Sequence, residues 1–340
     1  MGYFNKKAIM GAGAMGMLLG AALTHAGEEI DLIDINKNHV EALRKNGVTV
    51  CGSRELHAYV NAMTPDELQG QYDLVFLMCK QTGSRGAMES LLPHLGENSI
   101  VCTLQNGMPE MLVSEYIGKQ RTVGCAVTWA AMGAGPGCTR ATSPESSWHN
   151  CLGSYTGSID DRVLEIKTIL EKLCPVEVSK NLLGVRWSKL LLNTSVSGVT
   201  TLLGCEYGEV LRNDTVMRWV QEVARECVKT SLACGVQMEP LAPGQNMADL
   251  MSYSCEEERI KKRKVFYDII GSPENTGKAS MLQDIEKGRK SEVDYICGLV
   301  SKMASDHGVN TPYVDAVTNG IREIEAGKRK PSMENLCLIP

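Results

Sequence analysis

The stretch Ala8-Ile-Met-Gly11-Ala-Gly13-Ala-Met-Gly16 brings an apolar run directly into a glycine-rich loop. At this spacing the first glycine allows a tight turn after a strand, and the second lets the backbone approach a pyrophosphate closely. The third lets the following helix pack against the sheet, and the free N–H groups at the helix start can hold the pyrophosphate. The pattern therefore predicts a dinucleotide-binding loop made by Gly11, Gly13, Ala14, Met15 and Gly16.

The flanking residues favour this interpretation over an ordinary glycine-rich turn. Residues 7–10 suit a first strand, residues 15–26 a helix and residues 30–33 a second strand. Asp34 ends that strand and follows Gly16 by 18 residues, close to the spacing of a carboxylate that binds a ribose 2′-hydroxyl. Strand, loop, helix, strand and acid occur in the order that a Rossmann unit requires.

The composition excludes several other classes of protein. A chain of 340 residues has room for two domains, and its net charge of −5 gives no reason to expect nucleic acid as a partner. No apolar run reaches the ~18 residues of a membrane span, and the N-terminus does not resemble a signal peptide, so we expect a cytoplasmic protein. The 13 cysteines form no CxxC pair and do not cluster with histidine, which indicates reduced thiols and no metal site.

Strand and helix patterns alternate as far as about residue 180, which predicts an α/β domain with a parallel-rich sheet and helices on both faces. Beyond the first unit, the expected strands cover residues 48–51, 72–78, 99–104, 123–129, 148–155 and 176–178, with a glycine-rich hairpin around 133–137. From about residue 184 the patterns are helical, over 185–203, 215–233, 247–270, 281–307 and 311–326. We therefore predict a Rossmann domain over 1–182, an all-helical domain over 183–330 and a loose tail over 331–340.

Two polar residues follow predicted strands of the first domain, at the sheet edge where open parallel sheets bind ligands. Lys80 follows the strand that ends near residue 78, and Asn106 follows the strand that ends near residue 104. A solvated lysine and a simple Asn-Gly turn are the alternatives to a role at the cofactor.

The helix that opens the second domain carries Lys189, Asn193 and Ser197 in an otherwise apolar run. At about 100° per residue, these three side chains lie within about 80° of one another on one helix face. A lysine without a local acid partner is costly to bury. Lys189 therefore either extends to the helix edge or acts as a general acid whose pKa is tuned by burial.

Ser280 and Glu292 lie further along, in the segment expected to form one long helix. Ser280 stands where its hydroxyl can cap the helix start. Glu292, judged from its neighbours alone, is expected to be a surface acid.

Together these segments resemble the ketopantoate reductase family, the 2-dehydropantoate 2-reductases and related 2-oxoacid reductases. The resemblance covers nearly the whole chain and rests on five features in order: the glycine loop, Lys80, Gln105-Asn106-Gly107, Arg186-Trp187-Ser188-Lys189 with Asn193, and Ser280 followed by Glu292-Val293-Asp294-Tyr295. It implies a Rossmann domain, a helical domain and a cleft between them. It also implies hydride transfer from a nicotinamide cofactor to the carbonyl of a small 2-oxo acid, with ketopantoate as the default substrate and no metal.

The resemblance further implies roles for single residues. Lys189 matches the catalytic lysine that donates a proton to the nascent alkoxide, and Glu292 matches the acid that binds the substrate hydroxyl and orients the site. Lys80 matches a lysine near the cofactor. Asn106, Asn193 and Ser280 match substrate-binding positions, and Asn106 also lies near the cofactor. Ser197 matches a further substrate-binding position, at which the family often has a second asparagine.

One departure from the family pattern concerns the cofactor. Many members use NADPH, whereas Asp34 at the end of the second strand would repel a 2′-phosphate. NAD(H) is therefore favoured, although Lys37 nearby softens the repulsion and keeps NADP(H) open.

Other departures concern the substrate. Ser197 is the first of these departures. Tyr207 stands at a position where family members often have a polar residue that contacts the substrate, and Gly277 at a position where they often have asparagine. The segment over 238–277 is longer than in short members. These changes favour, as one alternative, a bulkier branched or aromatic 2-oxo acid.

Two alternatives belong to other classes. One is a non-catalytic dinucleotide-binding sensor, against which the retained polar residues of the helical domain argue. The other, more remote, is a glycerol-3-phosphate or hydroxyacyl dehydrogenase; the latter would need a catalytic histidine, which has no suitable candidate here. The long apolar helices of the second domain are compatible with a homodimer.

Overall fold

The computed structural model describes residues 2–240 and 246–340, and the chain divides into two compact units, Met1–Leu182 and Leu183–Pro340. Residues 241–245, which belong to the segment over 238–277 noted for its length, lie outside the described residues. Within the described part, no helix is long and apolar enough to cross a bilayer. Each unit is described by itself below.

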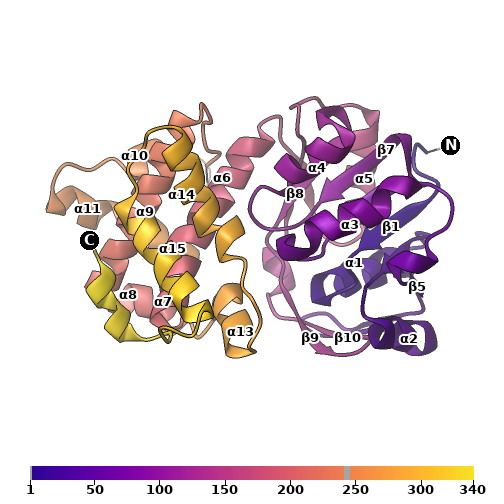
Figure 1. The fold of residues 1–340 in the computed structure, drawn as a ribbon, viewed down its shortest axis with the longest axis horizontal. Coiled ribbons are helices and arrows are strands. Elements are labelled where there is room, and N and C mark those ends of the chain that lie inside the picture. Colours follow the sequence, from indigo (N-terminus) through magenta and orange to yellow (C-terminus); the bar gives the residue numbers. More distant parts are fainter. Residues whose placement is uncertain (1, 241–245) are drawn as a thin grey trace. The chain divides into compact units, whose positions relative to one another are not determined.

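The first unit is built on an eight-stranded sheet in the order β12-β11-β8-β7-β6-β1-β2-β5. Figure 1 labels β1, β5, β7 and β8 of this sheet. All neighbouring strands pair in parallel except β8 and β11, which pair antiparallel. The predicted α/β architecture is therefore confirmed. The strands are β1 (Lys7–Met10), β2 (Asp31–Ile33), β5 (Asn61–Met63), β6 (Tyr72–Leu77), β7 (Leu95–Thr103), β8 (Thr122–Val127), β11 (Asn150–Ser154) and β12 (Val176–Val178).

Alternation of side chains along β1 divides the core between the two faces of the sheet. Ile9 packs in a cluster with residues of α1 and α5, whereas Ala8 and Met10 pack in a second cluster with residues of α3 and α4. Both faces are thus apolar, as expected where helices cover a parallel sheet on both sides. The helices of this unit are α1 (Ala14–His25), α2 (Lys37–Asn46), α3 (Ser84–Leu91), α4 (Pro109–Ile117) and α5 (Asp161–Leu170).

A second, four-stranded sheet packs against α1 and was not expected from the sequence. Its order is β4-β3-β10-β9, and it joins the predicted hairpin to the segment after α2. The central pair β3 and β10 runs parallel and connects residues about ninety positions apart, from Thr49 paired with Cys138 to Gly52 paired with Ala141. The strands are β3 (Val48–Gly52), β4 (Leu56–Ala58), β9 (Ala131–Gly135) and β10 (Cys138–Ala141).

The second unit is helical, as predicted, but three of the long helices expected there are interrupted. The segment expected to be continuous over 185–203 consists of α6 (Leu182–Leu192), the π-helix η6 (Asn193–Gly198) and α7 (Val199–Leu203). The segment over 247–270 is divided into three short helices, and the segment over 281–307 is broken after Glu286, where Gly288 takes a φ of +67°. Helices α9, α14 and α15 pack on one another and on η6.

The helices of this unit, several of which Figure 1 labels, are α6 (Leu182–Leu192), η6 (Asn193–Gly198), α7 (Val199–Leu203), α8 (Gly208–Arg212), α9 (Asp214–Ala233), α10 (Met247–Leu250), α11 (Glu256–Lys262), α12 (Lys264–Ile270), α13 (Ser280–Glu286), η7 (Val293–Tyr295), α14 (Cys297–Asp306), α15 (Pro312–Glu325) and η8 (Met333–Leu338).

The residues over 331–340, expected to be a loose tail, are instead part of the second unit. They form the short helix η8, which packs against α7. Asn335 is 2 % exposed, and its side-chain amide donates a 2.8 Å hydrogen bond to the Leu202 carbonyl. That carbonyl belongs to the last turn of α7, where helix carbonyls have no partner within the helix. The expectation of a loose tail was therefore wrong.

A buried carboxyl joins two helices of this unit. Glu226 of α9 accepts the backbone N–H groups of Tyr313 (3.2 Å) and Val314 (2.8 Å) at the start of α15. Burial raises the pKa of Glu226 to about 7, and the two hydrogen bonds offset only part of that rise. The folded protein therefore favours the protonated acid over a pH range in which the unfolded chain has released its proton.

This raised pKa predicts that thermal stability falls as pH rises from about 5 to about 8. A group whose pKa is higher in the folded state stabilises the fold fully below its unfolded pKa, and that contribution is lost as pH rises through the folded pKa. We expect Glu226→Gln to flatten this part of the profile of melting temperature against pH, because the amide does not titrate. Glu257→Gln, at an exposed position of α11, is the matched control. Parallel profiles for wild type and Glu226→Gln would contradict the assignment.

Candidate functional site

The glycine loop is so closely packed that two of its glycines exclude any side chain. Gly11 has a φ of +104°, and a Cβ placed on it would lie 2.3 Å from the backbone nitrogen of Cys79. A Cβ on Gly16 would lie 2.1 Å from the Gly11 carbonyl oxygen. Real Cβ atoms cannot approach so closely, so α1 begins where it does only because both positions are glycine.

Gly13 differs from the other two glycines because, among the described residues, no atom beyond its two chain neighbours lies within 4 Å of the Cβ position it would have. It is the N-cap of α1, and no side chain caps the helix. The first backbone bond along the helix runs from Met17 N–H to the Gly13 carbonyl, so the N–H groups of Ala14, Met15 and Gly16 precede the helical ladder. Bare backbone next to a helix N-terminus fits the pyrophosphate of a dinucleotide.

Asp34 lies at the carboxyl end of β2, half-buried, on the same sheet edge as the glycine loop. Its backbone N–H donates to the Met63 carbonyl (3.1 Å), and its Oδ1 accepts the N–H of Asn36 (3.0 Å). These bonds hold the acid at the point where Ile33 O also receives the N–H groups of the loop. Lys37, considered as a partner for a cofactor phosphate, lies 4.0 Å from Asp66 with both side chains exposed.

Lys80 and Asn106 follow β6 and β7, so the structure brings both to the sheet edge that carries the glycine loop. The two strand ends are joined by buried amides that the motif alone did not mark as important. Gln105, 6 % exposed, donates to the Cys79 carbonyl (2.5 Å) and to Ser84 Oγ (2.7 Å), and Gln81 donates to the Asn106 carbonyl. Asn106 is half-buried and Lys80 exposed.

In the helical unit, Lys189 and Asn193 are half-buried on α6 and at the first residue of η6. Ser197 lies in η6, whose i to i+5 hydrogen bonds and wider turns replace the continuous α-helix expected there. The Ser197 hydroxyl lies 3.2 Å from the Tyr207 hydroxyl, so two residues noted as departures from the family pattern form a hydrogen bond. Sequence periodicity does not show a π-helix.

Ser280 and Glu292 both differ from the expectations drawn from their neighbours. Ser280 is the exposed first residue of α13, whose N-cap is Ala279 and has no side-chain capping bond, so Ser280 does not cap the helix. Glu292 is not on the same helix; it precedes η7 and is 8 % exposed, so it is not a surface acid. A carboxyl group this deeply buried needs hydrogen-bonding or charged partners.

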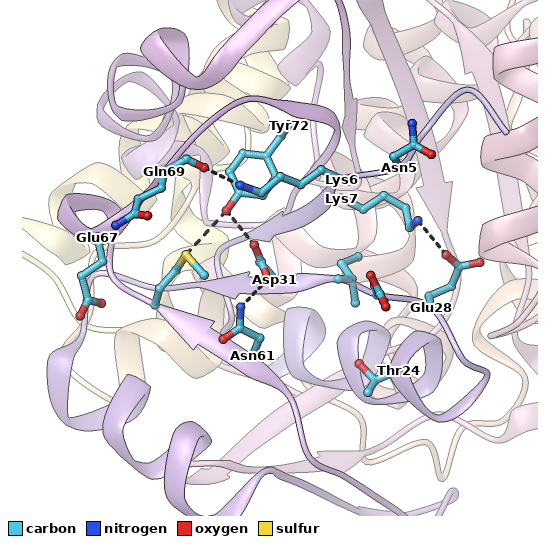
Figure 2. Close-up of a pocket in the computed structure, with 13 residues that line it drawn as sticks. Asn5, Lys6, Lys7, Thr24, Glu28, Asp31, Asn61, Glu67, Gln69 and Tyr72 are labelled. Carbon is cyan, nitrogen blue, oxygen red and sulfur yellow. Dashed lines mark hydrogen bonds and ion pairs between the residues drawn. The ribbon is translucent and has the colours of Figure 1, made fainter. Parts of the chain in front are cut away.

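A hollow of about 620 Å³ lies at the opposite edge of the sheet (Figure 2). Its lining includes the first residues of four strands: Lys7, Asp31, Asn61 and Tyr72. Asp31 accepts hydrogen bonds from Asn61 (2.6 Å) and Tyr72 (2.8 Å), and Lys7 pairs with Glu28 (3.0 Å). Open parallel sheets bind ligands at the other edge, so these paired groups are best explained as stabilising the ends of the strands.

Family models match both units of the chain. The model described as "Ketopantoate reductase PanE/ApbA" covers residues 8–152, and the model for the C-terminal part of the same proteins covers residues 181–325. The chain belongs to the ketopantoate reductase family. Family membership makes it an NAD(P)-dependent oxidoreductase with a Rossmann domain, a helical domain and a nicotinamide dinucleotide cofactor.

Similar proteins include two archaeal 2-dehydropantoate 2-reductases. The one from Pyrococcus abyssi is 29 % identical over 89 % of this chain and 92 % of its own length. The one from Archaeoglobus fulgidus is 26 % identical over 94 % and 97 %.

Two solved structures share the fold over 95 % of this chain and 99 % of their own. A PanE/ApbA family ketopantoate reductase from Ralstonia eutropha aligns with a TM-score of 0.78 at 26 % identity. D-mandelate dehydrogenase in complex with NADH and anilino(oxo)acetate aligns with a TM-score of 0.79 at 23 % identity.

The contrast between two glycines provides a test of the loop. We expect Gly13→Ala to keep a melting temperature close to wild type, since the added methyl group would stand in open space. The same methyl group should weaken dinucleotide binding at least about tenfold, because it would occupy the space of the pyrophosphate. Gly16→Ala should instead lower the melting temperature by roughly 3–10 °C, because its Cβ collides with the backbone. Fluorescence titration and thermal unfolding measure the two effects. Unchanged binding in Gly13→Ala would place the pyrophosphate elsewhere.

Proposed function

We propose that the protein reduces a 2-oxo acid to a 2-hydroxy acid with NADH, and that 2-dehydropantoate (ketopantoate), which gives pantoate, is its default substrate. The observation that carries the proposal is the bare Gly13 backbone at the start of α1, followed by Asp34 at the end of β2. Family membership over nearly the whole chain adds the reaction class and the substrate named for its relatives.

The preference for NADH follows from charge and position. A carboxylate at the end of the second strand accepts hydrogen bonds from ribose hydroxyls and repels a 2′-phosphate. Lys37, the nearest cation in sequence, stands beside Asp66, which reduces its value as a phosphate ligand. We therefore expect NADH to be the better cofactor of the two.

Lys189 is the proton donor in this proposal. A nicotinamide dinucleotide held by the glycine loop and Asp34 would supply the hydride for the carbonyl carbon. As the C=O π electrons move onto oxygen, the Lys189 ammonium stabilises the developing alkoxide and then gives it a proton, which leaves a hydroxyl group and a neutral amine. Glu292 is proposed to bind the hydroxyl of the substrate. Asn106, Asn193 and Ser280 are proposed to position the 2-oxo acid substrate. The half-buried position of Lys189 and the burial of Glu292 support these roles.

A bulkier branched or aromatic 2-oxo acid is a second candidate substrate, and one contact favours it. Ser197 is hydrogen-bonded to Tyr207, so its hydroxyl is already engaged by the protein. A Cβ on Gly277 would lie 3.1 Å from the Tyr207 ring, so the absence of a side chain there makes room for the ring. An aromatic ring in place of a polar contact favours apolar substrate groups.

The decisive assay follows loss of absorbance by reduced nicotinamide with ketopantoate, with NADH and NADPH in parallel and a panel of branched and aromatic 2-oxo acids. We expect kcat/KM to be highest with ketopantoate and higher with NADH than with NADPH. A larger kcat/KM for an aromatic 2-oxo acid would assign the second candidate. Tight dinucleotide binding without turnover of any 2-oxo acid would contradict enzyme function and indicate a sensor.

The role of Lys189 predicts that Lys189→Ala lowers kcat by about 10²–10⁴-fold, the usual contribution of a general acid, while the dissociation constant for the dinucleotide stays near wild type. Lys302→Ala, at an exposed position of α14, is the matched control and should leave both values unchanged. Steady-state kinetics and fluorescence titration separate the two effects. Full turnover by Lys189→Ala would remove this residue from the mechanism.

A further inference from the structure

We propose that His39 is a positioning residue for the cofactor: its imidazole joins the glycine loop to the second sheet and fixes the loop in its dinucleotide-binding conformation. His39 Nε2 lies 2.8 Å from the carbonyl oxygen of Ala12, between the two glycines that form the turn. On the other side of the ring, the Gly137 N–H lies 3.3 Å from Nδ1. The inference rests on the proposed cofactor site and extends it to a residue outside the loop.

The two contacts require one tautomer of the neutral ring. A carbonyl oxygen can only accept, so Nε2 carries the proton and donates it to Ala12. A backbone N–H can only donate, so Nδ1 is the acceptor for Gly137. Both ring nitrogens are therefore engaged with backbone groups of two different segments, and the ring acts as a fixed spacer between them.

The ring is itself held from both ends. His39 lies in the first turn of α2, and its own N–H donates to the side chain of the N-cap residue Asn36 (3.2 Å). Gly137 has a φ of +71°, and its carbonyl receives the N–H of Thr49 at the start of β3 (2.9 Å). One anchor is a residue of α2 and the other is a turn residue between β9 and β10 that is bonded to β3, so the imidazole links the position of both to the loop.

Other bonds from the second sheet reach the start of α1. Thr139 of β10, which has no exposed surface, donates through its hydroxyl to the Ala14 carbonyl (3.0 Å). The Ala131 N–H of β9 lies 3.2 Å from the sulfur of Met15. With His39, these contacts hold Ala12, Ala14 and Met15 from the side of the second sheet.

The main sheet holds the same loop from the opposite direction. The N–H groups of Gly11 and Ala12 both donate to the carbonyl of Ile33, at 2.8 and 3.1 Å. Ala12 is thus held through its N–H by β2 and through its carbonyl by His39. The two bonds fix the peptide units on either side of the Ala12 Cα, which restricts the φ and ψ of this residue, and such preorganisation reduces the ordering cost of binding a ligand.

The test compares dinucleotide affinity in three variants of the full chain, by calorimetric titration with NADH and NADPH. His39→Leu removes both hydrogen bonds and should raise the dissociation constant about tenfold. His39→Gln, whose amide can donate to the Ala12 carbonyl, should restore most of the affinity. His57→Leu is the matched control. His57 lies on β4 of the second sheet, where its ring contacts the Thr49 hydroxyl (3.3 Å) and the Tyr59 ring, so affinity should stay at the wild-type value.

The kinetic readout separates positioning from a general loss of stability. In His39→Leu the KM for the dinucleotide should rise about tenfold, while kcat at saturating cofactor stays near wild type. A merely structural role would lower the melting temperature and leave dissociation constant and KM unchanged, which would overturn the proposal. If His39→Leu does not fold, His39→Phe keeps a planar ring at this position without either ring nitrogen, and unchanged affinity in that variant would equally overturn the proposal.

The outcome also distinguishes this inference from the proposed function. Wild-type protein that binds neither NADH nor NADPH would contradict the proposed function and leave His39 no cofactor to position. Wild-type protein that binds a dinucleotide, together with His39→Leu that binds it equally well, would overturn only the role of His39.

Discussion

The passage of α1 over the carbonyl of Gly11 is the contact on which the first unit depends. A Cβ at Gly16 would lie 2.1 Å from that oxygen, and a Cβ at Gly11 would lie 2.3 Å from the backbone after β6. These approaches let the chain leave β1, turn and start a helix within three residues. The same geometry leaves the Cβ position of Gly13 open and places the first N–H groups of α1 ahead of the helical ladder without a side-chain cap, which is why an anion fits there.

The parts of the fold that could be predicted from the sequence are those with local signals. The glycine spacing, the strand before it and Asp34 after it all lie within about thirty residues, and the structure has β1, α1 and β2 within one or two residues of the predicted bounds. The second sheet could not be predicted in this way, because the pairing of β3 with β10 joins segments far apart in the chain. Strand pairing of this kind depends on tertiary packing more than on propensity. Thr139 contacts the loop, and Gly137 contacts His39, from segments that this pairing holds in place.

The helical unit shows a different limit. Helical periodicity correctly indicated the class of the domain, but it did not show where helices break, because a glycine such as Gly288 can lie inside a helix or end it. The π-helix at Asn193–Gly198 leaves the apolar pattern almost intact, so periodicity does not show it. Glu292 was expected at the surface because charged residues surround it, and only the fold shows that it is buried. Ser197 and Tyr207 likewise meet only in three dimensions.

The packing of η8 on α7 has a consequence for the order in which the two units can form during synthesis. The strands of the first unit are complete once Val178 has been made, and they need nothing from the helical residues to pair with one another. In the second unit, the carbonyl of Leu202 at the end of α7 accepts a hydrogen bond from the amide of Asn335, which lies more than one hundred residues later in the chain. The first unit can therefore fold while the chain is still emerging from the ribosome, whereas the helical unit reaches its final packing only after the segment around Asn335 has been released.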